Sequence, residues 1–145
     1  PPCLSILIAL DTNEGVAGHS SLDPYLKQSV RYIIPAIQDL AAAAKGQPVA
    51  PVDAYRRGIS SLHLVGREGV SMIAVSGLDM AAWDALAKAA EMPLAVFLGG
   101  TVGPVPAYNS NGLWLTPVDE LSAEAATLVA EGGFTGHGAR RVRHR

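Results

Sequence analysis

Two aspartates in one apolar stretch are the residues of this chain best suited to chemistry. Asp79 and Asp84 lie within residues 73–100, where small and apolar side chains recur at helical spacing. Paired carboxylates could serve acid–base or metal chemistry, but five residues along a helix separate two side chains by about 140°. The two carboxylates should therefore point apart. We predict structural roles, with bonds to backbone or to the Trp83 indole, because buried charges are normally paired.

Histidine and serine offer two further possibilities. His19 could be a metal ligand or a catalytic base, but no acid or cysteine stands near it at ligand spacing, so a hydrogen-bonded structural role is favoured. Ser76 precedes Gly77, yet the Gly-x-Ser-x-Gly signature of many hydrolases is absent. The histidines and serines permit a catalytic triad without predicting one. A stand-alone hydrolase with an unrecognised serine site is therefore kept as one alternative.

The N-terminal part of the chain predicts a β-hairpin. Residues 4–10 form an apolar, β-rich run, residues 11–15 carry strong turn chemistry, and residues 16–20 follow as a second short strand. Two strands alone are marginal in water, so we expect the hairpin to begin part-way through a larger sheet.

Helical segments are predicted for most of the remainder. They cover residues 24–44, a segment that begins at 51, the central stretch as far as Pro93, and residues 117–131. Asp23 and Thr116 are the expected N-caps of the first and last of these helices, and Pro35 should kink or split the first. Residues 94–98 should form a short apolar turn or helix that ends at the Gly99–Gly100 pair.

The central stretch also carries a specific sequence pattern. It is Ala74-x-Ser76-Gly77-Leu78-Asp79-Met80-Ala81-x-Trp83-Asp84-x-x-Ala87-Lys88, followed by Pro93-Leu94-x-x-x-Leu98-Gly99-Gly100. This pattern resembles the signature of the mandelate racemase/muconate lactonizing enzyme family of the enolase superfamily, although Phe97 stands where that family usually has Leu. The resemblance implies an α+β fold. It would comprise an N-terminal capping domain, made of a β-hairpin remnant followed by a helical bundle, and a first βα unit of an incomplete TIM barrel.

The resemblance also implies how the chain is divided. Residues 3–100 would be the capping domain without its first strands, since two further strands and a mobile loop precede the hairpin in that family. Residues 101–136 would be a linker and the first β/α elements of a truncated barrel. Residues 137–145 form an Arg-, His- and Gly-rich tail outside the resemblance. A shifted reading frame is one explanation for this tail, and a short basic arm is another.

The reaction shared by the resembled family is proton abstraction next to a carboxylate, which gives an enolate held by Mg²⁺. A Lys-x-Lys motif ends the family's second barrel strand and three acidic Mg²⁺ ligands lie on later strands, whereas no lysine follows Lys88 here. The resemblance thus implies a truncated homologue of a Mg-dependent racemase, cycloisomerase or dehydratase. We expect this chain to hold no catalytic residue, metal ligand or cofactor of its own and to be inactive in that reaction.

Two residues are implied as substrate-binding by the resemblance. Tyr25 matches a substrate-facing aromatic position, and core packing at a helix start is its alternative. Ser110 falls where a family member has a serine at the active site, where it would donate a hydrogen bond to a substrate carboxylate. The alternative for Ser110, a turn serine beside Asn109 and Asn111, is favoured.

Composition argues against several classes of function. Hydrophobic residues make up 49% of the chain and charged residues 17%, which is typical of a globular protein. No apolar run reaches the ~18 residues of a membrane span, no secretory signal is evident, and Cys3 alone forms no intrachain disulfide. The net charge of −2 argues against nucleic-acid binding. We therefore expect a cytoplasmic protein without membrane or nucleic-acid partners.

Partners are expected from the apolar surface on which a barrel would dock. Such a surface favours self-association, so we predict a homo-oligomer and, as a further possibility, a barrel-bearing partner chain. A non-catalytic binding or assembly module is the remaining alternative, in which the apolar surfaces and the arginines of the tail would serve a partner.

Overall fold

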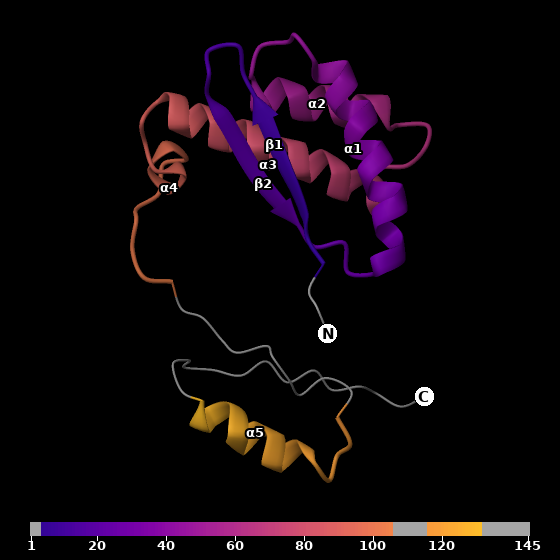
Figure 1. Cartoon of the computed structure of the whole chain (residues 1–145), viewed down its shortest axis with the longest axis vertical. Coiled ribbons are helices and arrows are strands. Elements are labelled where there is room, and N and C mark those ends of the chain that lie inside the picture. The colour runs from indigo at the N-terminus through magenta and orange to yellow at the C-terminus, as the bar shows by residue number, and fades with distance from the viewer. Residues whose placement is uncertain (1–3, 106–115, 132–145) are drawn as a thin grey trace. The chain divides into compact units, whose positions relative to one another are not determined.

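The computed structural model describes residues 4–105 and 116–131 (Figure 1). The chain divides into two compact units, Pro1–Val102 and Gly103–Arg145. The predictions for Ser110, for the start of the barrel after residue 105 and for the tail 137–145 lie outside the described residues.

The first unit opens with the predicted hairpin. Strand β1 (Ile6–Asp11) pairs antiparallel with β2 (Ala17–Leu22), from Ile6 opposite Leu22 to Asp11 opposite Ala17. The turn closes with a 3.0 Å hydrogen bond from Thr12 N–H to Val16 O. One face of the hairpin is buried through Ile6, Ile8 and Leu22, whereas Leu7 is 80% exposed on the other. Side chains alternate between the faces of a strand, so this register fixes which residues enter the core.

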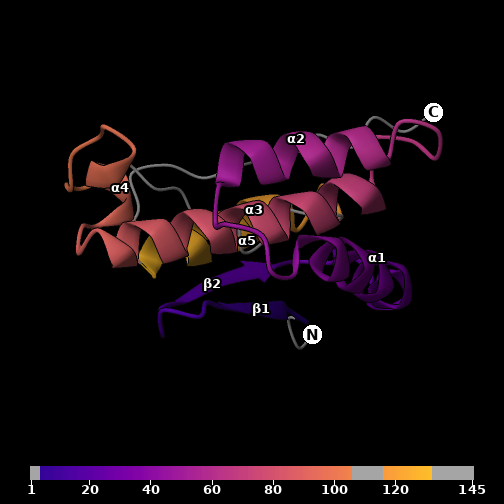
Figure 2. The same cartoon turned by 90° about the horizontal axis from the view of Figure 1, so that it is seen from above.

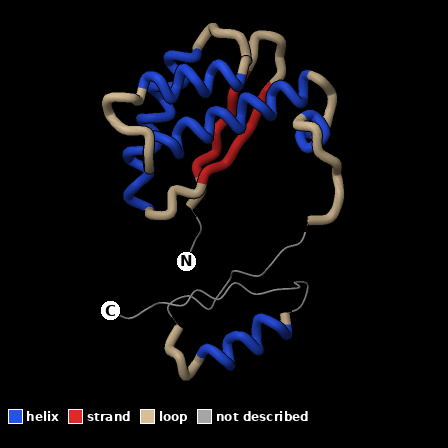
Figure 3. Tube along the Cα trace, turned by 180° about the vertical axis from the view of Figure 1, so that it is seen from behind, coloured by secondary structure: helices blue, strands red, loops and turns tan. Residues whose placement is uncertain are grey.

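Four helices complete the first unit. They are α1 (Val30–Ala44), α2 (Pro51–Ser61), α3 (Val70–Ala89) and α4 (Leu94–Phe97). In Figure 2, α3 lies between α2 on one side and the hairpin on the other, with α1 beside the strands. The view from behind shows α3 crossing both strands (Figure 3). The central helix predicted from the sequence is thus the element against which β1, β2, α1 and α2 pack.

The core forms where small residues of α3 meet the hairpin and α1. Ala74 and Ala81 are fully buried against Ile8 and Ile33, and small side chains allow this close approach. At Gly18 the hairpin comes so near that an added Cβ would lie 2.0 Å from Ala81 O. The apolar content of α3 therefore serves internal packing.

Among the described residues, helix α3 is long and apolar enough to cross a membrane, judged by length and composition alone. The sequence expectation concerned an uninterrupted apolar run, and the charged residues Asp79, Asp84 and Lys88 interrupt this helix. A helix at the centre of a packed domain meets the same criteria, and α3 packs against strands and helices along its length.

Helix α1 starts later than the sequence predicts. Pro24 does not begin the helix, because Tyr25 has a positive φ of 57° and the following 3₁₀ turn covers Lys27–Ser29. Asp23 accordingly caps a turn, where its Oδ1 accepts the Tyr25 N–H at 2.8 Å. Of the two outcomes predicted for Pro35, a kink or a split, the split is wrong, since α1 runs through Pro35 as one helix.

For the two shortest α-helices, the prediction of α4 is confirmed, whereas the predicted start of α5 (Leu121–Ala130) is wrong. Helix α4 and its glycine end are confirmed, with Gly99 at φ 86° and Gly100 N–H bonded to Ala95 O at 2.7 Å. In the second unit, α5 begins four residues after Pro117. Thr116 does not cap its N-terminus, because its hydroxyl donates to Glu124 Oε2 at 2.7 Å.

Candidate functional site

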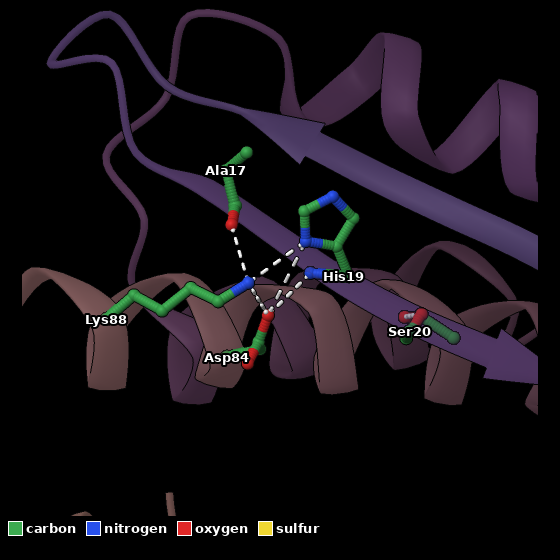
Figure 4. A network of polar contacts seen from close by, with 6 residues as sticks. Ala17, His19, Ser20, Asp84 and Lys88 are labelled. Carbon is green, nitrogen blue, oxygen red and sulfur yellow. Dashed lines mark hydrogen bonds and ion pairs between the residues drawn. The ribbon is translucent and has the colours of Figure 1, made fainter. Parts of the chain in front are cut away.

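A polar network joins β2 to α3 on the surface of the first unit (Figure 4). Asp84 on α3 accepts the backbone N–H of His19 at Oδ2 over 2.7 Å, and the same oxygen lies 2.7 Å from Lys88 Nζ. Asp84 and Lys88 are four residues apart, so helix geometry alone brings their side chains together. The contact with His19 is different, because it depends on how the hairpin is seated on α3.

Lys88 binds β2 at two further points. Its Nζ lies 3.0 Å from Ala17 O and 3.0 Å from His19 Nδ1. An ammonium group only donates hydrogen bonds, so Nδ1 of His19 must be the acceptor and the ring proton must sit on Nε2. The three donors of Lys88 are thereby shared among a carboxylate, a carbonyl and an imidazole. This arrangement confirms His19 as a hydrogen-bonded structural residue.

The partners of Asp84 stabilise its charged form. The hydrogen bond from Lys88, followed by the one from the His19 backbone, holds the pKa of the Asp84 carboxyl below its ordinary value. A carboxylate held in this way is a poor general base, because its proton affinity is reduced and one oxygen is already bonded twice. Asp84 therefore fastens β2 to α3, as the sequence predicted for a structural carboxylate.

Asp79 lies in a different environment one and a half turns earlier. Burial raises the pKa of its carboxyl, and a hydrogen bond with the Trp83 side chain partly offsets this shift. Trp83 in turn meets Phe97 of α4 edge to face, with ring centroids 6.2 Å apart. The predicted bond between Asp79 and the Trp83 side chain is confirmed.

Both aspartates line an open groove of about 540 Å³ between β2, α3 and α4. Its walls also include Ser20, Ser21, Met80 and Leu98. The groove combines apolar surface with two carboxylates, and His19 also lines it. Among the described residues of the groove, no serine hydroxyl is hydrogen-bonded to a histidine, as nucleophilic catalysis would require, and Ser20 donates to Gly77 O instead. The groove resembles a packing surface more than a reaction centre.

The described residues do not fit a magnesium site. Within 4–105 and 116–131, no three His, Cys, Asp or Glu side chains gather to hold a metal ion. Two side chains of ligand type, those of His19 and Asp84, lie together, with Nδ1 and Oδ2 4.0 Å apart. Lys88 already occupies that carboxylate, and its positive charge would repel a divalent cation.

A serine-hydrolase site has no support in the described part of the chain. The serine hydroxyls that form hydrogen bonds there donate to backbone carbonyls, as Ser20 does to Gly77 O at 2.7 Å and Ser61 to Gly58 O at 2.8 Å. His63 likewise bonds a carbonyl, that of Ser60, through Nδ1 at 2.7 Å. A catalytic serine needs a histidine or lysine within hydrogen-bond reach, and none of these contacts provides one.

Of the two predicted substrate-binding residues, only Tyr25 is described. Its side chain is 85% exposed, so core packing at a helix start, the alternative interpretation, is wrong. The turn that presents Tyr25 was not predicted from the sequence, although Asp23 two residues earlier is a signal for it. The link between Lys88 and His19 was not predicted either, although the spacing of Asp84 and Lys88 favours an ion pair on the same helix.

The first unit matches a known family along nearly its whole length. Residues 4–99 fit the sequence model of the mandelate racemase / muconate lactonizing enzyme N-terminal domain. The chain belongs to this family. The two-stranded sheet with its helices is the capping-domain fold of the enolase superfamily.

Curated family relatives match about half of the chain. L-talarate/galactarate dehydratase of Salmonella typhimurium is 45% identical over 73 residues, which are 50% of this chain and 18% of that enzyme. Arabinonate dehydratase of Saccharolobus solfataricus is 36% identical over 69 residues, again 18% of the relative. The chain thus spans less than a fifth of these two enzymes in the matched region.

Solved family members superpose on most of the chain. A magnesium-bound enolase from an alpha proteobacterium, BAL199, is 51% identical with a TM-score of 0.88, and the match covers 97% of this chain and 40% of that one. An enolase from Bradyrhizobium, complexed with magnesium and mandelic acid, is 34% identical with a TM-score of 0.79 and is covered over 36% of its length. The family therefore uses magnesium, whereas the larger part of each solved relative has no counterpart here.

Proposed function

We propose that this chain provides the capping domain of a Mg²⁺-dependent enzyme that abstracts a proton next to a carboxylate. The observation that carries the proposal is the match of residues 4–99 to the family's N-terminal domain. The structural agreement with a magnesium-bound relative supports it. The described residues hold no metal-ligand cluster, so the metal and its chemistry would belong to the barrel. Bound there, Mg²⁺ would stabilise the negative charge that develops on the substrate carboxylate.

We infer an α-hydroxy carboxylate as the substrate class. L-talarate, galactarate and arabinonate, which name the curated relatives, all carry a hydroxyl on the carbon next to a carboxylate. Mandelic acid, bound by the Bradyrhizobium relative, has the same unit. Either racemisation or dehydration can start by removing the proton from that carbon. Sugar acids are favoured over aromatic acids because the curated relatives are sugar-acid dehydratases.

Within such an enzyme, the residues of this chain would position and enclose the substrate. The phenol of Tyr25 and the hydroxyl of Ser110 are the proposed contacts, both able to donate a hydrogen bond to a carboxylate. The network of Asp84, Lys88 and His19 would keep β2 fixed against α3 while the capping domain covers the active site.

A barrel is the proposed cover for the groove between β2, α3 and α4. Large apolar side chains are partly exposed along it and along α4, at 41% for Met80, 38% for Val96 and 57% for Leu98. Contiguous apolar surface of this kind usually marks an interface. We also propose that the protein is a homo-oligomer in the cytoplasm. We further propose that it has no nucleic-acid or membrane partner, and the net charge of −2 supports this last proposal.

A chimera tests the proposed function. Residues 4–99 would replace the aligned segment of the Salmonella dehydratase, and galactarate dehydration would be measured with and without Mg²⁺. We expect Mg²⁺-dependent turnover at a reduced rate, because the recipient barrel keeps its catalytic groups. A soluble, folded chimera without any turnover would contradict the proposal, and turnover by the present chain alone would show that the chemistry lies within it.

A further inference from the structure

The segment that links the hairpin to α1 forms an unusual tight turn around Tyr25. Leu26 N–H donates to Pro24 O at 2.6 Å, which closes a three-residue γ-turn with Tyr25 at its centre. The φ of Tyr25 is 57°, a left-handed value that bulky residues rarely adopt. A γ-turn with positive φ at its centre is the strained form. This conformation persists only if neighbouring groups hold it.

Two side chains supply that support. Asp23 Oδ1 accepts the N–H of Tyr25 at 2.8 Å. The Ser29 hydroxyl lies 2.5 Å from Pro24 O and 2.7 Å from Leu26 O, so its hydrogen is directed between the two carbonyls that flank Tyr25. The central amide and both flanking carbonyls are thereby held from either side of the turn.

The fold gains no packing from the residue that is held in this way. Tyr25 is 85% exposed and the adjacent Leu26 is 59% exposed. Of the other tyrosines that the structure describes, Tyr32 and Tyr55 are 53% and 41% exposed and lie on regular helices. Strain at an exposed aromatic residue is typical of a binding contact, because a side chain fixed in advance loses less entropy when its ligand arrives.

We propose that Asp23 and Ser29 are positioning residues that hold the Tyr25 phenol in place to donate a hydrogen bond to the substrate. The proposal rests on the proposed function, because it takes an α-hydroxy carboxylate as the ligand. The carboxylate of such a substrate accepts a charge-assisted hydrogen bond from a phenol. Neither Asp23 nor Ser29 needs to touch the substrate, since each acts through the backbone of the turn.

The positioning itself is tested on the present chain by amide hydrogen exchange. Asp23→Ala should speed exchange at the Tyr25 amide about fivefold, the effect of losing one hydrogen bond, and Ser29→Ala should speed exchange at Leu26. Asp53→Ala and Ser61→Ala are controls of the same residue types in α2, where Asp53 pairs with Arg56 at 3.6 Å and the Ser61 hydroxyl donates to Gly58 O at 2.8 Å. Unchanged exchange at Tyr25 in Asp23→Ala would overturn the proposal.

The consequence for binding is tested in the chimera with galactarate. We expect Tyr25→Phe and Asp23→Ala each to raise KM about fivefold, with kcat changed less and Mg²⁺ affinity unchanged, while Asp53→Ala leaves KM as it is. A raised KM in Tyr25→Phe alone would show that Asp23 is merely structural and would overturn the proposal. If every chimera is inactive, the proposed function fails, and the exchange result still decides whether Asp23 and Ser29 hold Tyr25.

Discussion

At the scale of single residues, Asp79 and Asp84 show how strongly local partners govern a carboxylate. Both belong to α3, yet burial raises the pKa of Asp79 while Lys88 and His19 lower that of Asp84. A carboxyl whose pKa is lowered by folding stabilises the protein above its unfolded pKa of about 3.9. That contribution is lost as the pH falls through the folded pKa. For Asp79 the sign is opposite, and ionisation costs stability as the pH rises.

Asparagine substitutions at the two positions should therefore act in opposite directions. Asp84→Asn is expected to lower the free energy of unfolding at pH 7 by about 1–2 kcal/mol, because the ion pair with Lys88 is lost. Asp79→Asn should raise it by up to about 1 kcal/mol, because a neutral amide can still accept from Trp83 without the cost of a buried charge. Urea unfolding at pH 7 and pH 3 measures both effects, which should shrink at pH 3. Equal losses in the two variants at pH 7 would show that this electrostatic account is mistaken.

Backbone strain at Tyr25 leads to a second prediction at this scale. Tyr25→Gly should change the free energy of unfolding by less than about 0.5 kcal/mol or increase it, since glycine adopts φ 57° without strain. Tyr55→Gly, a matched change at a partly exposed tyrosine of α2, should cost about 1 kcal/mol or more, because glycine is unfavourable inside a helix. Thermal unfolding of both variants would measure the difference. A Tyr25 variant less stable than the Tyr55 variant would mean that the turn is not strained.

The sequence predicted part of this residue-level account. The bond between Asp79 and Trp83 was predicted from their spacing on one helix. The ion pair of Asp84 with Lys88 was not predicted, although the same helix spacing favours it. The contact of Asp84 with the His19 backbone spans 65 positions of the chain. It depends on the register of β2 against α3, which spacing within either element does not determine.

At the scale of elements, two glycines determine how closely the hairpin approaches α3. A Cβ at Gly18 would lie 2.0 Å from the backbone oxygen of Ala81, which cannot move without shifting the helix. At Gly77 it would lie 2.5 Å from Ile8 Cδ1, the end of a flexible side chain. A Cβ at Gly103 would meet nothing within 4 Å.

Substituting alanine at each of these three glycines should therefore lower the free energy of unfolding by graded amounts. We expect Gly18→Ala to cost about 3 kcal/mol or more and Gly77→Ala about 1–3 kcal/mol, because overpacking is worse against backbone than against a mobile methyl group. Gly103→Ala should stay within about 0.5 kcal/mol of the unaltered chain. Denaturant unfolding monitored by circular dichroism measures the series. Were Gly18→Ala as stable as Gly103→Ala, the close packing of β2 on α3 would be refuted.

Element types were easier to predict than element boundaries. Apolar spacing identified α3, β-rich runs around strong turn residues identified the hairpin, and the residues from Pro51 onward identified a second helix. Residues 94–98 were predicted as a turn or helix, and the structure has the helix α4 there. The starts of α1 and α5 were predicted several residues early. In both, a capping residue and a proline stand at the expected start, but the Asp23 and Thr116 side chains bond elsewhere, to the Tyr25 amide and to Glu124.

At the scale of the whole molecule, the residues that form the capping-domain fold are different from the residues that would carry out the reaction. The signature around α3 identified the family from sequence because it reflects packing within the capping domain, whose family model matches residues 4–99. The catalytic groups could not be predicted in the same way. This chain covers 40% of a solved magnesium-bound relative, and its described residues provide no ligand cluster for that ion.

Magnesium binding tests this separation most directly. Isothermal titration of MgCl₂ into the present chain and into the Salmonella chimera, at equal protein concentration, compares the capping domain with and without a barrel. We predict saturable binding by the chimera and none by the present chain, because the described carboxylates are dispersed or, at Asp84, paired with Lys88. Stoichiometric binding of Mg²⁺ by the present chain alone would contradict the account and would locate a metal site within it.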